Sequence, residues 1–117
     1  MLSDGDLRDL KAELERRLAE LESQGAATRD SRRPVELDQQ SVGRLSRMDA
    51  MQQQAMAMAT EQRRLAAGQR IRAALRRLET DEYGDCLRCG EEIALARLRL
   101  DPATALCVPC LEGGEDR

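Results

Sequence analysis

The sequence predicts a mainly α-helical fold in which an antiparallel two-helix coiled-coil hairpin is followed by a small cysteine-rich module. Three observations predict it: leucines at helical spacing near the N-terminus, a long proline-free stretch after them, and four cysteines in the last third of the chain. With 117 residues, 35% of them charged and a single aromatic, the chain lacks the material for a large globular core. We expect the hairpin in residues 1–80 and the cysteine module, with a short flexible C-terminal tail, in 81–117.

The first helix is expected over about residues 4–24. Ser3 followed by Asp4 and Asp6 is typical of a helix start, because the serine side chain can cap the first turn and acids favour it. Gly25 is expected to end the helix, and a polar stretch containing Pro34 predicts a tip loop over about 25–38. The leucines that form one apolar stripe on this helix are Leu7, Leu10, Leu14, Leu18 and Leu21.

The second helix is expected over about residues 39–81, with Asp38 as a possible cap and Gly84 near its end. It is longer than the first helix, so part of it stays uncovered. We expect that part toward the stem, around residues 62–80, unless the cysteine module packs there. Methionine adapts to loose packing, and the core of the hairpin is the expected place for Met48, Met51, Met56 and Met58.

Arginines are concentrated in the stem part of the second helix, where residues 62–78 carry six of them and no acid. They are Arg63, Arg64, Arg70, Arg72, Arg76 and Arg77. Such a run is either a solvated face or a docking surface for a phosphate or an acidic partner. Arg70 is our candidate for such a contact.

The four cysteines, Cys86, Cys89, Cys107 and Cys110, follow the pattern C-x2-C-x17-C-x2-C. This spacing predicts one structural zinc ion held by four thiolates, with no open position for catalysis. Two disulfides are the alternative, but nothing in the sequence signals secretion. The chain contains no histidine and no apolar run near 18 residues, so we expect a cytoplasmic protein that is neither membrane-bound nor an enzyme.

The stretch from Tyr83 to Ile93, YGDCLRCGEEI, carries a resemblance to a known family. It continues through Ala96-Arg97-Leu98, Pro102-Ala103-Thr104 and LCVPC at 106–110. In these residues the chain resembles the DksA/TraR family of bacterial C4 zinc-finger transcription regulators. The resemblance implies a protein that inserts its coiled-coil arm into the secondary channel of RNA polymerase and modulates initiation. It also implies no direct sequence-specific DNA binding.

The resemblance further implies that acidic residues at the hairpin tip approach the polymerase catalytic centre. The Asp-x-x-Asp-x-Ala string found in the best-known members is absent here. Our candidates for polymerase-facing residues are Asp38 and Asp49, which lie close to three helical turns apart, together with Arg44 and Arg47.

Two further positions depart from the family pattern where prototypical members bind the alarmone guanosine tetraphosphate. Asp101 and Leu111 stand where basic residues are frequent, and Arg70 is the one stem position that still suits a phosphate. We therefore expect alarmone binding to be weak or absent. The alternative function is a zinc-ribbon coiled-coil adaptor that dimerises or binds another protein without regulating polymerase.

Overall fold

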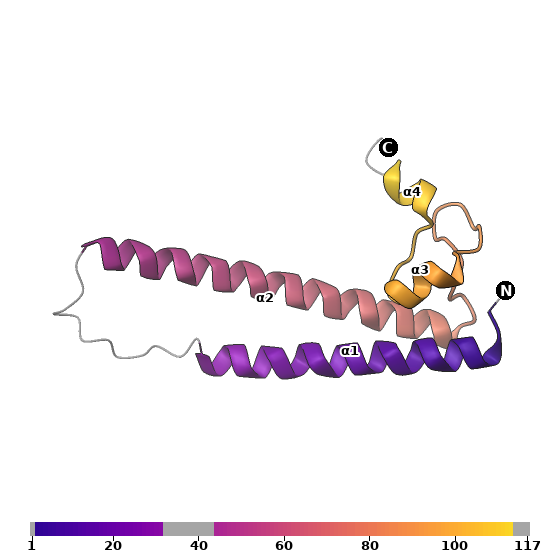
Figure 1. Ribbon diagram of the computed structural model, residues 1–117, viewed down its shortest axis with the longest axis horizontal. Coiled ribbons are helices and arrows are strands. Elements are labelled where there is room, and N and C mark those ends of the chain that lie inside the picture. Colours follow the sequence, from indigo (N-terminus) through magenta and orange to yellow (C-terminus); the bar gives the residue numbers. More distant parts are fainter. Residues whose placement is uncertain (1, 32–43, 114–117) are drawn as a thin grey trace.

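The computed structural model describes residues 2–31 and 44–113, with the backbone alone at 27–31, 44 and 45. Two long helices, α1 (Asp4–Ser31) and α2 (Arg44–Glu79), run antiparallel side by side (Figure 1). Two short helices, α3 (Leu95–Leu100) and α4 (Val108–Glu112), lie at the end where α2 finishes. Extended pairing within the described ranges is limited to one bridge between Asp85 and Glu92. The mainly α fold is confirmed.

Helix α1 begins where the sequence predicts. The Ser3 hydroxyl accepts a hydrogen bond from the Asp6 backbone N–H at 3.0 Å, and the Asp6 carboxylate accepts one from the Ser3 N–H at 3.1 Å. These reciprocal bonds occupy two amide groups that a helix N-terminus otherwise leaves unpaired. They also lower the pKa of Asp6, chiefly through the Ser3 backbone.

The expected end of α1 at Gly25 is wrong, because the helix continues to Ser31 and residues 25–31 do not belong to a loop. Gly25 is buried, and a Cβ on it would lie 2.5 Å from the guanidinium carbon of Arg64 on α2. Glycine here permits a close approach between the helices, since Arg64 also donates a hydrogen bond to the Leu21 carbonyl at 3.1 Å. The rest of the expected tip loop lies outside the described residues.

Helix α2 ends at Glu79, close to the expected position. Asp81, two residues later, turns the backbone out of the helix. Asp81 takes the left-handed conformation with a φ of 61°, and the Glu82 N–H donates to the Arg77 carbonyl at 2.9 Å. This six-to-one bond is the mark of a Schellman ending. The expected start of α2 near residue 39 and the Asp38 cap lie outside the described residues.

The buried core lies at the stem, where α1, α2 and the cysteine module meet. Leu14 and Leu98 are fully buried there, and Ile71 and Ile93 nearly so. The apolar members of this core are Leu10, Leu14, Ile71, Ala74, Tyr83, Cys86, Ile93, Leu98 and Ala103. The condition attached to our expectation is met at Ile71 and Ala74, which are buried where the module packs on the stem, whereas Leu65 keeps 48% of its surface exposed.

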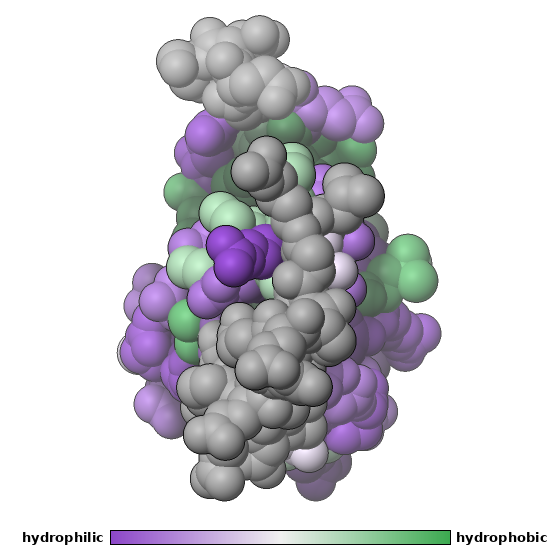
Figure 2. All heavy atoms as spheres, turned by 90° about the vertical axis from the view of Figure 1, so that its left-hand side faces the viewer, coloured by the Kyte–Doolittle hydropathy of each residue, from purple (hydrophilic) through white to green (hydrophobic). Residues whose placement is uncertain are grey.

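Apart from Leu65, the exposed large apolar side chains of the described part of α2 lie in its first half, which corrects the expectation that its methionines form a core. Met48, Met51, Met56 and Met58 expose 61%, 69%, 68% and 53% of their surface. Viewed from the end at which α2 begins, the described surface is largely hydrophilic, with smaller hydrophobic patches between the polar groups (Figure 2). In the described ranges, no helix combines the length and hydropathy that a membrane span requires.

Candidate metal centre

The first cysteine pair lies in a tight turn that directs both sulfurs to one side. The Gly90 N–H donates to the Cys86 carbonyl at 2.9 Å, and Gly90 has a φ of +78°, a conformation that glycine adopts without steric cost. The Cys89 backbone N–H points at the Cys86 sulfur at 3.5 Å. Cys86 is buried and Cys89 is exposed, so the site lies at the surface of the module.

The second pair is placed by the start of α4. Cys107 is the residue before the helix and Cys110 lies within it. Pro109 fits the first turn because its missing N–H would have no partner there, and the Leu111 N–H donates to the Cys107 carbonyl at 2.9 Å. The helix turn therefore brings the sulfurs of residues three apart to the same side.

The four sulfurs converge on one point. All four Sγ atoms lie within 4.8 Å of one another, and those of Cys89 and Cys107 are 3.6 Å apart. Zn–S bonds of ~2.3 Å in a tetrahedron place sulfurs ~3.8 Å apart, so the donor set and its spacing fit zinc. All four thiols are free, and 3.6 Å far exceeds a disulfide bond of about 2.05 Å, so the two-disulfide alternative is wrong.

The protonation of the thiols reflects their crowding. The Cys89 backbone N–H, with help from other amides, lowers the pKa of Cys86 to about 6. Hydrogen bonding to Cys107 and then Cys89 raises the pKa of Cys110 to about 12, because neighbouring thiolates would repel one another. A divalent cation removes this repulsion and holds all four cysteines as thiolates.

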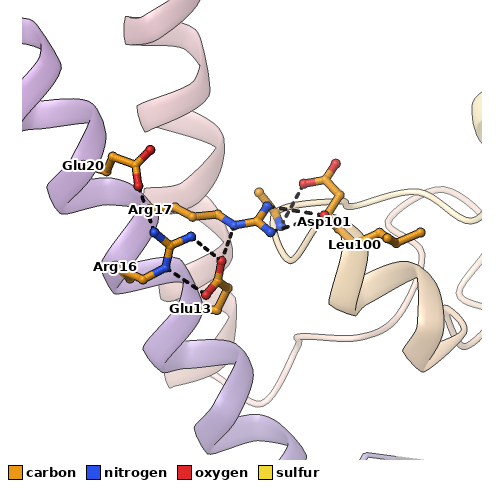
Figure 3. A network of polar contacts seen from close by, with 7 residues as sticks. Glu13, Arg16, Arg17, Glu20, Leu100 and Asp101 are labelled. Carbon is orange, nitrogen blue, oxygen red and sulfur yellow. Dashed lines mark hydrogen bonds and ion pairs between the residues drawn. The ribbon is translucent and has the colours of Figure 1, made fainter.

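A polar network attaches the module to the hairpin (Figure 3). Both terminal nitrogens of Arg17 on α1 point to the Leu100 carbonyl at 3.4 Å, while its Nε binds Glu13 at 2.6 Å. From the other helix, Arg70 forms an ion pair with Asp101 at 2.9 Å. Leu100 and Asp101, at the end of α3, are therefore held by α1 and α2, respectively.

A buried hydrogen bond completes this attachment. The Tyr83 hydroxyl donates to the Pro102 carbonyl at 2.7 Å, and burial raises the pKa of Tyr83 to about 12. Nothing in the sequence pointed to the contacts made by Arg17 and Tyr83. Asp101 is an acid where basic residues are frequent, and its charge, opposite to that of Arg70, was the available signal for their pairing.

Three of the candidate residues at the tip lie at the start of α2. Arg44 begins the helix, and Arg47 and Asp49 are exposed within its first six residues. Asp49 and Arg47 are two residues apart, so they face opposite sides of the helix. Asp38 lies outside the described residues.

Comparisons with known proteins agree with this geometry. Residues 81–115 match the prokaryotic dksA/traR C4-type zinc finger. The RNA polymerase-binding transcription factor DksA of Haemophilus influenzae is 46% identical over 41 residues, which are 35% of this chain and 28% of that protein. The structure of transcription factor DksA2 from Pseudomonas aeruginosa matches with a TM-score of 0.77 and 26% identity, covering 98% of this chain and 87% of that one. The cysteine cluster is therefore a C4 zinc-finger site for one metal ion.

Proposed function

Because the chain is a DksA-like member of the DksA/TraR C4 zinc-finger family, we propose that it regulates transcription by binding bacterial RNA polymerase. The observation that carries the proposal is the structural match to DksA2, which extends beyond the zinc finger over 98% of the chain. The match therefore includes the hairpin arm, which a shared zinc motif alone would not explain.

The finer proposal is that the arm enters the secondary channel of the polymerase and modulates initiation without chemistry of its own. The shape supports this, since α2 is 36 residues long, about 54 Å, and its buried apolar residues, Ile71 and Ala74, lie toward the stem. The polar network at the stem fixes the direction of the arm relative to the module. A pre-ordered rod loses little conformational entropy when it enters a pore.

At the tip, we propose that the polymerase-facing residues are Asp38, Arg44, Arg47 and Asp49. Asp49 is the sharpest candidate for the regulatory effect, because its carboxylate is exposed on the second turn of α2. A carboxylate placed near a metal-dependent active centre changes the electrostatic field at that centre.

We also propose that guanosine tetraphosphate binds weakly or not at all. The Arg70 guanidinium already has a carboxylate partner in Asp101, and a phosphate would have to displace it. The pair is exposed, with 54% and 43% of the two side chains accessible. Asp101 therefore competes with a phosphate for Arg70 but does not block access to it.

The test is binding of the purified, zinc-loaded protein to core RNA polymerase, with a known secondary-channel factor as competitor. We expect competed binding and a changed transcript yield from an rRNA promoter. Asp49→Asn should bind normally and lose part of the transcriptional effect. Asp9→Asn, an exposed acid on α1 near the module, is the matched control and should behave as wild type. Absence of binding at micromolar protein would reject the proposal and favour an adaptor that acts on another partner.

A further inference from the structure

Helix α2 carries two patterns in which the spacing alternates between three and four residues, the a and d repeat of a coiled coil. The inner seam is buried or half-buried at each of its seven positions. It consists of Ala57, Glu61, Arg64, Gly68, Ile71, Leu75 and Leu78. The outer stripe is exposed at each of its six positions. It consists of Met48, Met51, Ala55, Met58, Gln62 and Leu65.

The outer stripe is not a continuation of the inner seam. Arg64 on the seam donates to the Leu21 carbonyl of α1 at 3.1 Å. A Cβ on Gly68 would lie 3.9 Å from a methyl group of Leu18, so the seam faces α1. At 3.6 residues per turn, the centre of the outer stripe is turned from that of the seam by roughly 130°. Packing of α1 therefore does not explain the regular spacing of the outer stripe, which extends over about 26 Å.

The charges near the outer stripe are balanced and lie away from it. Residues 48–65 carry two acids and two arginines, and the six positions of the stripe carry no charge. Glu61 and Arg64 pair with each other on the inner seam. Asp49 and Arg63 lie more than about 100° from the centre of the stripe. The face is therefore neutral and selects neither an acidic nor a basic partner.

The positions that border the outer stripe also favour a second copy of the chain. They are the e and g positions of the repeat, where coiled coils place the charges that select a partner. Most of them are small or uncharged here, namely Gln52, Gln54, Ala59 and Ala66. Two copies of this face can therefore approach closely without rows of like charge opposing each other.

The continuation of the repeat decides the orientation of such a pair. Beyond Leu65 the same pattern reaches Arg72 and Arg76. In a parallel pair each of these arginines would lie beside its own copy, which opposes association. The ion pair of Arg72 with Glu22 at 3.6 Å is half-exposed and offsets this only in part. An antiparallel pair avoids the repulsion, because it places the two stems at opposite ends.

The antiparallel register uses the whole outer stripe. When the pair is centred between residues 56 and 57, every a position meets a d position of the second copy. The three layers, each of which occurs twice, are Met48 with Leu65, Met51 with Gln62, and Ala55 with Met58. Six layers make a small interface, within the range below about 1,200 Å² that is typical of weak and reversible association.

We propose that the outer stripe pairs with a second copy of this chain as a short antiparallel coiled coil, and that this pairing keeps the arm out of the polymerase channel. The exclusion rests on the proposed function, whereas the pairing itself does not. By mass action the paired fraction rises with protein concentration, so the pairing would limit the number of free arms as the protein accumulates.

Sedimentation equilibrium of the full, zinc-loaded chain tests the pairing. We expect a reversible dimer with a dissociation constant on the order of tens of micromolar. Met58→Glu places a carboxylate in a central layer and should weaken pairing at least about tenfold. Met56→Glu is the matched control, because it adds the same charge at an exposed position on another side of the helix. It should pair within about twofold of wild type, and circular dichroism should show that both variants keep their helices.

Photo-crosslinking tests the register and the exclusion. In a mixture of isotopically labelled and unlabelled chains, a photo-crosslinking residue at position 48 should join one copy to the peptide that contains Leu65 of the other. A crosslink to the region around residue 48 of the other copy would overturn the antiparallel register. Saturating core polymerase should abolish the crosslink between copies. A crosslink that persists in the polymerase-bound protein would overturn the exclusion.

The outcomes separate this inference from the proposed function. A chain that stays monomeric throughout the micromolar range overturns the pairing, whether or not it binds polymerase. A dimer that Met58→Glu leaves intact uses another surface and overturns the assignment of the outer stripe. A chain that pairs as expected but does not bind polymerase supports the pairing and overturns the proposed function and, with it, the exclusion.

Discussion

The two halves of α2 differ in nearly everything except secondary structure. Toward its end, Ile71 and Ala74 are buried among residues of α1 and the zinc module. Toward its beginning, Met48 and Met51 are as exposed as polar surface residues. The same helix is thus a structural element at the stem and a presented surface in its first half.

The difference shows how a short chain with little apolar material builds an arm. Buried contacts, metal ligands and polar attachments are concentrated at one end, where the stem cluster combines both long helices with the module. Toward the other end of α2, the large apolar side chains Met48, Met51, Met56 and Met58 are exposed. Substitutions should therefore have large effects on stability at the stem and small ones in the first half of α2.

The largest expected effect is removal of the metal. The module holds few buried residues of its own, so metal binding supplies much of its folding free energy. Chelation, or Cys110→Ser, should abolish amide protection across residues 83–113 in hydrogen exchange. Exchange in residues 46–60 should remain as in the zinc-loaded protein. Retained protection of the module without metal would contradict a structural role for the zinc.

Next in size is the contrast between a core leucine and an exposed methionine. Leu14→Ala empties a fully buried position at the stem and should lower the free energy of unfolding by about 3 kcal/mol. Met51→Ala removes a side chain that is 69% exposed and should change it by less than about 0.5 kcal/mol. Chemical denaturation of the zinc-loaded chain measures both. Equal losses would show that the first half of α2 is packed against something.

A smaller effect is expected where the helices approach most closely. In Gly25→Ala the new Cβ meets the Arg64 guanidinium, so that side chain must give up its bond to the Leu21 carbonyl. The lost charge-assisted bond outweighs the better helix propensity of alanine, and we expect a net loss of up to about 1 kcal/mol. The thermal midpoint of the zinc-loaded protein should fall.

Gly68→Ala is the matched control and should act in the opposite direction. Its Cβ would lie 3.4 Å from Arg72 Nη1 and 3.9 Å from Leu18 Cδ1, which are tolerable contacts with flexible side chains. Alanine then stabilises the helix by up to about 1 kcal/mol. If both substitutions shift the midpoint in the same direction, the close approach at Gly25 is not the cause.

The smallest effect concerns pH. Hydrogen bonds from Arg16 and then Arg17 lower the pKa of Glu13 to about 2, from an ordinary value of 4.5. A lowered pKa in the folded state means that its contribution is present above pH 4.5 and is lost as the pH falls through about 2. The stability difference between wild type and Glu13→Gln should therefore shrink across this window.

Much of the local structure could be predicted because its determinants are close in sequence. The Ser3–Asp6 cap lies within one turn, and each zinc-ligand pair lies within four residues. The spacing of the leucines fixed one face of α1, and Leu10 and Leu14 are buried on that face. The end of α1 was misjudged because a glycine that ends a helix and one that admits a neighbouring side chain look alike in sequence.

The sequence by itself therefore determined the presence of two long helices, the apolar face of α1 and the four-cysteine zinc site, since hydrogen-bond period and ligand geometry act over a few residues. The tertiary structure alone decided which half of α2 is covered, that Gly25 faces Arg64, and that Arg70 is paired with Asp101. Those contacts join residues more than thirty positions apart. They have one physical cause. The chain can bury only a little apolar surface, and which helix faces are buried depends on how all the elements pack together.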